Sequence, residues 1–205
     1  MGLSAEQLAR GLDAVAASEP AIATALARAG YPEPRIRETG YRTLLRTIVG
    51  QQVSVAAAAS VWRKLEGLLG EEMPPEALLA ADFDALRACG LSRQKQGYAR
   101  SLCELVAGGE LDLMDLPADD EEAIAQLVRI KGIGRWSAEI YLLFAEGRRD
   151  VFPAGDLAVQ IELGRLMGFE EKPTEKQLRE IGERWRPHRG AAAVLAWHSY
   201  NSTVL

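Results

Sequence analysis

Two features of this sequence combine residue types and spacing that could do chemistry: a glycine-rich turn and an aspartate that follows it. The turn, residues 131–135, reads KGIGR and lies between two segments with helical spacing of apolar residues. Its glycines can adopt positive φ and expose backbone N–H groups, which bind anions at the start of a helix. Lys131 and Arg135 add positive charge, and we expect Ile133 to turn inward and hold the two helices together. The turn therefore predicts a phosphate-binding site, although a plain helix-to-helix turn would also explain it.

The aspartate, Asp156, stands 22 residues after the second glycine of the turn and directly follows the sequence Pro-Ala-Gly. An apolar segment with helical spacing begins after it, so we expect Asp156 at the N-cap of a helix. A helix N-terminus favours negative charge, so the side chain could act as a fixed carboxylate that stabilises a cation or handles a proton. The alternative is an N-cap with no chemistry, which is the usual role of an aspartate before a helix.

The composition argues against several other kinds of enzyme. The two cysteines, Cys89 and Cys103, form no CxxC pair, so the sequence predicts no disulfide framework, zinc site or iron–sulfur cluster. The sequence has two histidines, His188 and His198, which argues against a histidine-based metal site or catalytic triad. We therefore expect no cofactor and no metal required for catalysis. The amino terminus lacks a signal-peptide pattern and no stretch reaches the ~20 apolar residues of a membrane span, so we expect a cytoplasmic protein with no membrane partner.

Charge is distributed unevenly along a chain whose net charge is −5. Residues 110–122 contain seven acidic side chains and no basic one, whereas residues 127–149 contain five Lys or Arg against two Glu. A basic face around the glycine-rich turn can therefore coexist with an acidic whole, and ordinary solvated helix faces are the alternative.

Helix-forming residues dominate, apolar residues recur at helical spacing, and runs with period two are nearly absent, so the sequence predicts an all-α fold of about ten helices. We expect one helix over residues 41–50 and another that ends at Lys131. Ser18 with Pro20 should open a helix that Gly30 closes, and TEKQ at residues 174–177 fits a capping box. The remaining expected boundary residues are the N-caps Ser54, Asp82, Ser92 and Asp119 and the helix-ending Gly70.

In combination, these motifs resemble the helix-hairpin-helix DNA glycosylase superfamily, in which a glycine-rich hairpin precedes an aspartate in a D-x-x-[VI] setting. Here that pattern is Asp156, Leu157, Ala158 and Val159. Three segments resemble the alkylbase glycosylases of the 3-methyladenine type II branch: LLRTIVGQQVSVAAAA, GIGRWSAE and ERWRPHRGAAAVLAWH. The resemblance covers roughly residues 41–200, and the order of the segments is more specific than any one of them.

The resemblance implies an activity and a role for several residues. Members of this family cut the bond between a damaged base and its sugar, and Asp156 would stabilise the developing sugar cation and orient the attacking water. The hairpin would anchor duplex DNA through Lys131, Gly132, Ile133, Gly134 and Arg135, with a monovalent cation possible at the backbone of Gly132 and Gly134. Relatives that also nick the strand carry a lysine where this chain has Trp136, so the resemblance implies a monofunctional glycosylase with water as the nucleophile.

Trp136 has the side chain expected of a base-pocket wall, because an indole face stacks on an extruded base and attracts its positive charge. The alternative is core packing, since Trp136, Ile140 and Leu143 share one helical stripe. Ile140 stands where the family has a pocket tyrosine, which departs from the pattern. The resemblance also places Trp197 in the pocket, with burial in the core as the alternative.

Further candidates are less constrained by spacing. Tyr41, Arg165 and His198 are additional possible pocket residues. The segment GQQVS, residues 50–54, occupies the place of the family's wedge, which fills the gap left by a flipped nucleotide. Gln51 and Gln52 are the wedge candidates, with Gln52 replacing an apolar residue, and a plain surface loop is the alternative.

The resemblance implies two helical subdomains with a DNA-binding cleft between them. Residues 41–149 would carry the wedge loop and the hairpin, and residues 1–40 with 150–205 would carry Asp156. The expected partner is double-stranded DNA containing alkylated bases, bound by a monomer in the cytoplasm in association with the bacterial nucleoid. The rival functions are a non-catalytic DNA-damage-binding module, a glycosylase for other damaged bases, and a helical protein-interaction domain.

Overall fold

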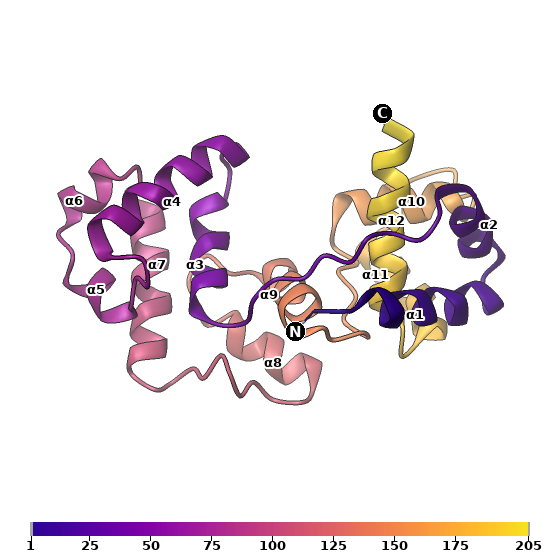
Figure 1. The fold of residues 1–205 in the computed structure, drawn as a ribbon. Helices are drawn as coiled ribbons and strands as arrows, with labels where there is room; N and C mark the ends of the chain where they lie inside the picture. The colour runs from indigo at the N-terminus through magenta and orange to yellow at the C-terminus, as the bar shows by residue number, and fades with distance from the viewer. Residues whose placement is uncertain (1, 205) are drawn as a thin grey trace. The chain divides into compact units, whose positions relative to one another are not determined.

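The computed structural model describes residues 2–204 and contains helices but no strand within that range (Figure 1). This confirms the expected all-α class. The helices in chain order are α1 (Ala5–Ser18), α2 (Pro20–Ala29), α3 (Tyr41–Gly50), α4 (Val55–Leu69), α5 (Pro75–Ala80), α6 (Phe83–Ala88), α7 (Arg93–Ala107), α8 (Asp120–Leu127), α9 (Arg135–Tyr141), α10 (Leu157–Leu166), α11 (Glu175–Gly182) and α12 (Arg189–Val204). A π-helical turn, Leu142–Glu146, continues α9, and a 3₁₀ turn, Glu183–Trp185, follows α11. No helix of the described part is both long and apolar enough to cross a bilayer.

Side-chain caps at the helix starts confirm most of the expected boundaries. Each of the four predicted N-cap residues accepts a hydrogen bond from a backbone N–H in the first turn of its helix; they are Ser54, Asp82, Ser92 and Asp119. The predicted capping box is present between Thr174 and Gln177. These bonds join residues two or three positions apart, so the local sequence is enough to specify them.

Two expected boundaries were wrong. The N-cap of α2 is Glu19 rather than Ser18, because α1 runs through Ser18 and the side chain of Ser18 donates back to the carbonyl of Val15. The helix expected to end at Lys131 ends at Leu127, and the chain then passes through turns whose N–H groups bond to carbonyls three positions back. The hairpin therefore occupies more of the chain than the glycine positions suggested.

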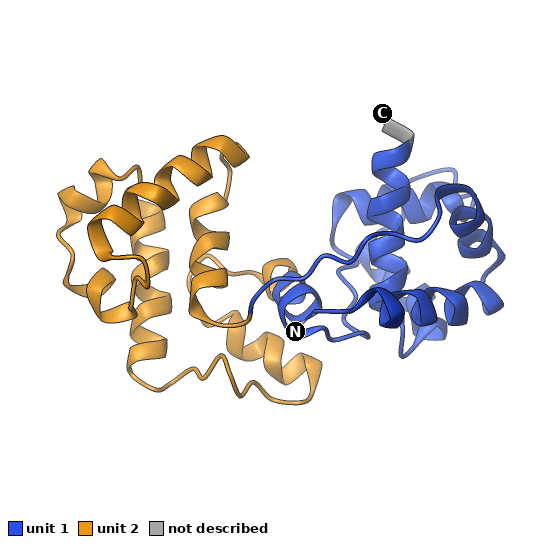
Figure 2. Ribbon diagram, viewed as in Figure 1, with its two compact units in different colours: residues 1–38, 139–205 blue, residues 39–138 orange. Residues whose placement is uncertain are grey.

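The chain divides into two compact units, residues 1–38 with 139–205 (unit 1) and residues 39–138 (unit 2), shown in Figure 2. The expected second boundary, after residue 149, differs from the one observed, before residue 139. Residues 139–149 lie in unit 1 because Ile140, Leu143 and Phe144 of this segment pack into its hydrophobic core.

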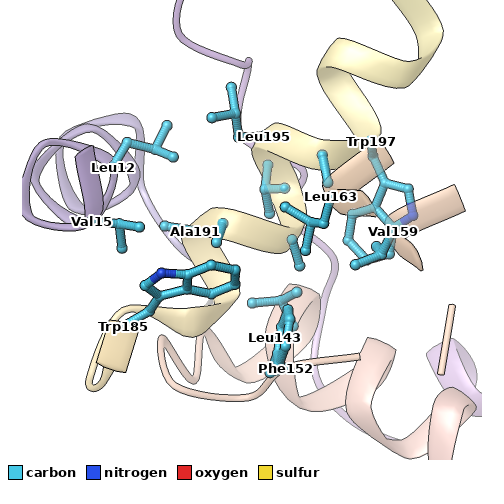
Figure 3. Close-up of a cluster of buried hydrophobic side chains, with 14 of the residues drawn as sticks. Leu12, Val15, Leu143, Phe152, Val159, Leu163, Trp185, Ala191, Leu195 and Trp197 are labelled. Carbon is cyan, nitrogen blue, oxygen red and sulfur yellow. The ribbon is translucent and has the colours of Figure 1, made fainter. Parts of the chain in front are cut away.

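The core of unit 1 gathers side chains from both ends of the chain, as Figure 3 shows. Phe152 meets Trp185 edge to face with 5.8 Å between ring centroids, and Phe144 lies 5.6 Å from Trp197. Aromatic pairs at these separations add about 1 kcal/mol each beyond the area that they bury. The labelled aliphatic members of this core are Leu12, Val15, Leu143, Val159, Leu163, Ala191 and Leu195.

The core of unit 2 forms where α3 packs against α4 and α7. One face of α3 contributes four buried side chains, α4 contributes Trp62 and Leu65, and α7 contributes Leu102 and Cys103. Because α3 ends directly before the expected wedge loop and α7 contacts the hairpin, this core supports both candidate DNA-contacting segments of the unit.

Candidate functional site

The hairpin between α8 and α9 has the backbone geometry of an anion-binding turn. Ile133 is 3% exposed, in agreement with the expectation that it turns inward. Gly132 has a φ of +83°, a conformation that side chains with a Cβ rarely adopt, whereas Gly134 does not have positive φ. Within the described part of the chain, the N–H groups of Gly132 and Gly134 have no hydrogen-bond partner, so both can serve an incoming anion.

Helix α7 forms the support beneath the hairpin. A Cβ at Gly132 would lie 2.2 Å from the ring of Tyr98, so only glycine allows the backbone to approach that ring so closely. The Ser101 hydroxyl accepts a hydrogen bond of 3.1 Å from the N–H of Lys131. The N–H of Lys131 is therefore engaged within the protein, while its ammonium-bearing side chain is exposed.

Arg135 forms an ion pair that sequence spacing did not reveal. Its guanidinium donates to both carboxylate oxygens of Glu121, one of them at 2.8 Å, and the arginine side chain is 40% exposed. Glu121 belongs to the acidic segment that precedes the hairpin, so part of the positive charge expected there is balanced by that segment. Of the two expected cations, Lys131 is the more exposed.

The two glutamines of the candidate wedge loop differ in their surroundings. Gln52 is exposed and has a φ of +54°, in the left-handed region that residues other than glycine seldom occupy. The side-chain amide of Gln51 donates a hydrogen bond of 2.8 Å to the carbonyl of Gly132 in the hairpin. Gln52 thus faces solvent, while the side chain of Gln51 faces the hairpin.

Trp136 is 47% exposed, although it shares a helical stripe with two core residues. Ile140 and Leu143 of that stripe are 8% and 1% exposed and pack in the core of unit 1. Core packing, the alternative interpretation of Trp136, is therefore not what the structure shows. About half of the Trp136 surface reaches solvent instead.

Asp156 is the N-cap of α10 and is partly exposed. Its Oδ1 accepts a hydrogen bond of 3.0 Å from the N–H of Val159 and a second of 3.0 Å from the indole Nε1 of Trp197. Trp197 is 9% exposed and lies beside Val159 in the core of unit 1 (Figure 3). Two donors on one oxygen hold the carboxylate in a single orientation.

The turn that carries Asp156 is held at several points. The buried side chain of Gln160 donates 2.9 Å to the carbonyl of Ala154, and Arg179 donates 3.3 Å to the carbonyl of Phe152. Arg179 also forms an ion pair of 2.8 Å with Glu139, whose side chain is 2% exposed. These contacts were not expected from the sequence, because each joins residues whose separation follows no helical period.

The remaining candidates make contacts within the protein. The Tyr41 hydroxyl lies 3.4 Å from the Cys103 sulfur, and burial raises the pKa of both groups, that of Cys103 to about 11. Arg165 binds the buried carboxylate of Glu162, and the His198 ring lies 2.8 Å from the carbonyl of Ala29.

The carbonyls considered for a cation also have partners. Gly132 O accepts from Gln51, and Gly134 O accepts from the N–H of Ala138 in the first turn of α9. In the described residues, no group of three or more His, Cys, Asp or Glu side chains is placed to hold a metal ion.

A glycine hairpin with free backbone donors, together with a helix-capping aspartate held by an indole, defines the class as an all-helical helix-hairpin-helix protein. The family model of the HhH-GPD superfamily base excision DNA repair proteins matches residues 45–187. The chain belongs to this superfamily, which confirms the resemblance seen in its motifs.

Three similar proteins place the chain near one branch. It is 32% identical over 189 residues to DNA-3-methyladenine glycosylase 2 of Escherichia coli, and the match covers 85% of this chain and 64% of that relative. The crystal structure of a DNA-3-methyladenine glycosidase from Bacillus halodurans superimposes with a TM-score of 0.87 at 31% identity, covering 95% of this chain and 90% of that one. A fission yeast 3-methyladenine DNA glycosylase in complex with abasic DNA gives a TM-score of 0.78 at 28% identity, covering 96% and 97%.

Proposed function

We propose that this protein is a DNA glycosylase that removes alkylated bases such as 3-methyladenine and 7-methylguanine in base excision repair. The observation that carries the proposal is the carboxylate of Asp156, whose Oδ1 is held by the N–H of Val159 and the indole of Trp197. The superfamily and the relatives named as 3-methyladenine glycosylases support the same conclusion. The substrate is alkylated double-stranded DNA, bound by a monomer in the cytoplasm in association with the nucleoid.

Cleavage of the base–sugar bond builds positive charge on the deoxyribose, and a carboxylate fixed in advance stabilises that charge without reorganising. Asp156 supplies this carboxylate and orients or deprotonates the attacking water. Trp197 is a positioning residue in this mechanism, because its indole N–H holds Oδ1. The water adds to the sugar carbon as the base departs with the bonding electron pair.

DNA is held and opened by unit 2. The N–H groups of Gly132 and Gly134 donate to a backbone phosphate, and Lys131 adds a nearby charge. The exposed Gln52 enters the gap that the flipped nucleotide leaves, and its amide can hydrogen-bond to the orphaned base. The exposed face of Trp136 stacks on the flipped base, where cation–π attraction of about 0.5 to 2 kcal/mol favours a positively charged alkylated ring.

Trp136 also bears on strand cleavage. Bifunctional relatives use a lysine at this place to form a covalent Schiff base with the sugar, and an indole has no nucleophilic amine. The reaction is therefore monofunctional, of the type II 3-methyladenine kind, with no lyase step.

The test is a base-release assay on methylated duplex DNA. We expect release of free 7-methylguanine or 3-methyladenine and alkali-labile sites without nicks. Asp156→Asn should keep DNA binding and the α10 cap, because asparagine caps helices as well as aspartate, but should slow release by about a hundredfold or more.

The matched control is Asp82→Asn, which makes the same change at the N-cap of α6 and should leave release unchanged. Release by Asp156→Asn at the wild-type rate would show that the assigned mechanism is wrong. Tight binding of alkylated DNA without any release by the wild type would favour the damage-binding module instead.

A further inference from the structure

The side chain of Gln51 connects two loops that are far apart in the sequence. Its Nε2 donates 2.8 Å to the carbonyl of Gly132, a residue 81 positions further along the chain. Gln51 is the first residue after α3, where its own N–H bonds to the carbonyl of Ile48, so its backbone is fixed to the end of that helix. The loop that carries Gln52 thus begins at a residue attached to the hairpin.

Helix α7 holds both loops from beneath. Lys95 donates 2.7 Å to the carbonyl of Val49 in the last turn of α3, and burial lowers the pKa of this lysine. On the same helix, the Tyr98 ring packs against Gly132 and the Ser101 hydroxyl accepts from the N–H of Lys131. Helix α7 therefore sets the positions of the α3 end and of the hairpin. The Gln51 amide adds a direct bond between these two segments.

The backbone of Gln52, the next residue, explains why the loop needs these contacts. Gln52 adopts a φ of +54°, and a residue with a Cβ relaxes from this conformation unless its surroundings hold it. The residue directly before Gln52 is Gln51, whose side chain is hydrogen-bonded to the hairpin. Loss of the bond would let the loop move relative to the phosphate-binding turn.

We infer that Gln51 is a positioning residue rather than a wedge. Its amide fixes Gln52 relative to the hairpin, so that the wedge and the phosphate-binding turn keep a constant spacing while the base is extruded. The inference rests on the proposed function for the meaning of the two loops. The bond between them is a property of the free protein and can be tested separately.

The first experiment measures amide hydrogen exchange in the full-length protein without DNA. Gln51→Met keeps the length and shape of the side chain but removes the donor, and exchange in residues 50–54 and 131–134 should both accelerate about fivefold, as expected for one lost hydrogen bond. Gln52→Met, the matched control at the neighbouring glutamine, should leave exchange at residues 131–134 unchanged. Unchanged exchange in the hairpin of Gln51→Met would show that the bond does not couple the loops.

The second experiment separates positioning from folding and from simple binding. For Gln51→Met, the affinity for undamaged duplex should stay within about twofold of wild type, while the single-turnover rate of base release and the fluorescence of a flipped 2-aminopurine should fall about tenfold. A mere loss of folded protein would instead lower binding and release together, and that result would overturn the inference. Wild-type release by Gln51→Met would also overturn it.

The two experiments also distinguish failure of the inference from failure of the proposed function. A wild-type protein that releases no base contradicts the proposed function, and the positioning role falls with it. The exchange result would still report whether Gln51 joins the two loops, because it involves neither DNA nor catalysis.

Discussion

Individual residues of this protein combine local and long-range contacts on a single side chain. Asp156 caps α10 through Val159 and also accepts from Trp197, which lies 41 residues away. The capping and catalytic interpretations of an aspartate before a helix are therefore compatible, because one cap bond uses only part of its accepting capacity. Trp136 likewise begins an apolar stripe and still exposes 47% of its surface, since the stripe enters the core of unit 1 only further along α9.

At Gln52 the residue scale allows a stability prediction. A left-handed φ of +54° costs a residue with a Cβ about 1 kcal/mol, and glycine removes this strain while adding freedom to the unfolded chain. Gln52→Gly should therefore leave the free energy of unfolding unchanged or raise it by up to about 1 kcal/mol, as measured by urea denaturation. Gln51→Gly, where φ is −59°, should lower it by about 1 kcal/mol or more. If the free energy of unfolding fell equally in the two variants, the assignment of backbone strain to Gln52 would be wrong.

Among the helices, α10 links the candidate catalytic group to a buried ion pair. Its first turn is capped by Asp156, and in its middle Glu162 is 1% exposed and accepts from Arg165 at 2.9 and 2.5 Å. Burial opposes ionisation of Glu162, but the hydrogen bonds from Arg165 and Ser199 and the charges of Arg165 and Arg28 outweigh it and lower the pKa of the carboxyl. The stability of α10 should therefore depend on pH.

The sign of this dependence follows from the lowered pKa. A carboxyl whose pKa is lower in the folded state contributes stability above its ordinary value of about 4.3 and loses that contribution as the pH falls through the folded value. Glu162→Gln should accordingly be less stable than wild type at neutral pH, and the difference in unfolding free energy should narrow as the pH falls from about 5 to 3. Glu180→Gln, at a carboxylate that is 66% exposed on α11, is the control and should track wild type throughout. If the difference in unfolding free energy between Glu162→Gln and wild type stayed constant over this pH range, the pH dependence would not come from Glu162.

For the whole molecule, a net charge of −5 does not describe the surface that the proposed substrate meets. The acidic segment 110–122 precedes the hairpin, and its Glu121 neutralises Arg135, so the exposed Lys131 is left as the hairpin's main positive charge. Binding to a polyanion depends on such local charges, because each phosphate contact releases condensed counterions.

Salt dependence tests this charge distribution. Lys131→Ala should weaken binding to any duplex and reduce the slope of log affinity against log salt by about 1. Glu121→Gln should strengthen binding at low salt, since it frees Arg135 from a bidentate partner. Lys176→Ala, at an 88% exposed lysine on α11 of the other unit, serves as the control for a general loss of charge. An equal effect of Lys131→Ala and Lys176→Ala would show that the hairpin is not the main anchor.

Local sequence determined the helical class, the starts of most helices and the motifs that identify the superfamily. Caps such as Ser54 and Asp119 bond within three residues, and the spacing of apolar residues along a helix depends only on its period, so neighbouring residues are sufficient to specify them. The glycine hairpin and Asp156 were recognisable for the same reason.

Packing of the helices decided which residues far apart in the sequence come into contact. The Gln51–Gly132 bond, the Arg135–Glu121 ion pair and the place of residues 139–149 in unit 1 all depend on side chains that meet only after the helices dock. No period in the chain encodes these distances, because they are set by how the volumes of two cores are filled. Only the tertiary structure therefore decided that Trp197 holds the Asp156 carboxylate, that α7 supports the hairpin and that Gln51 bonds to it.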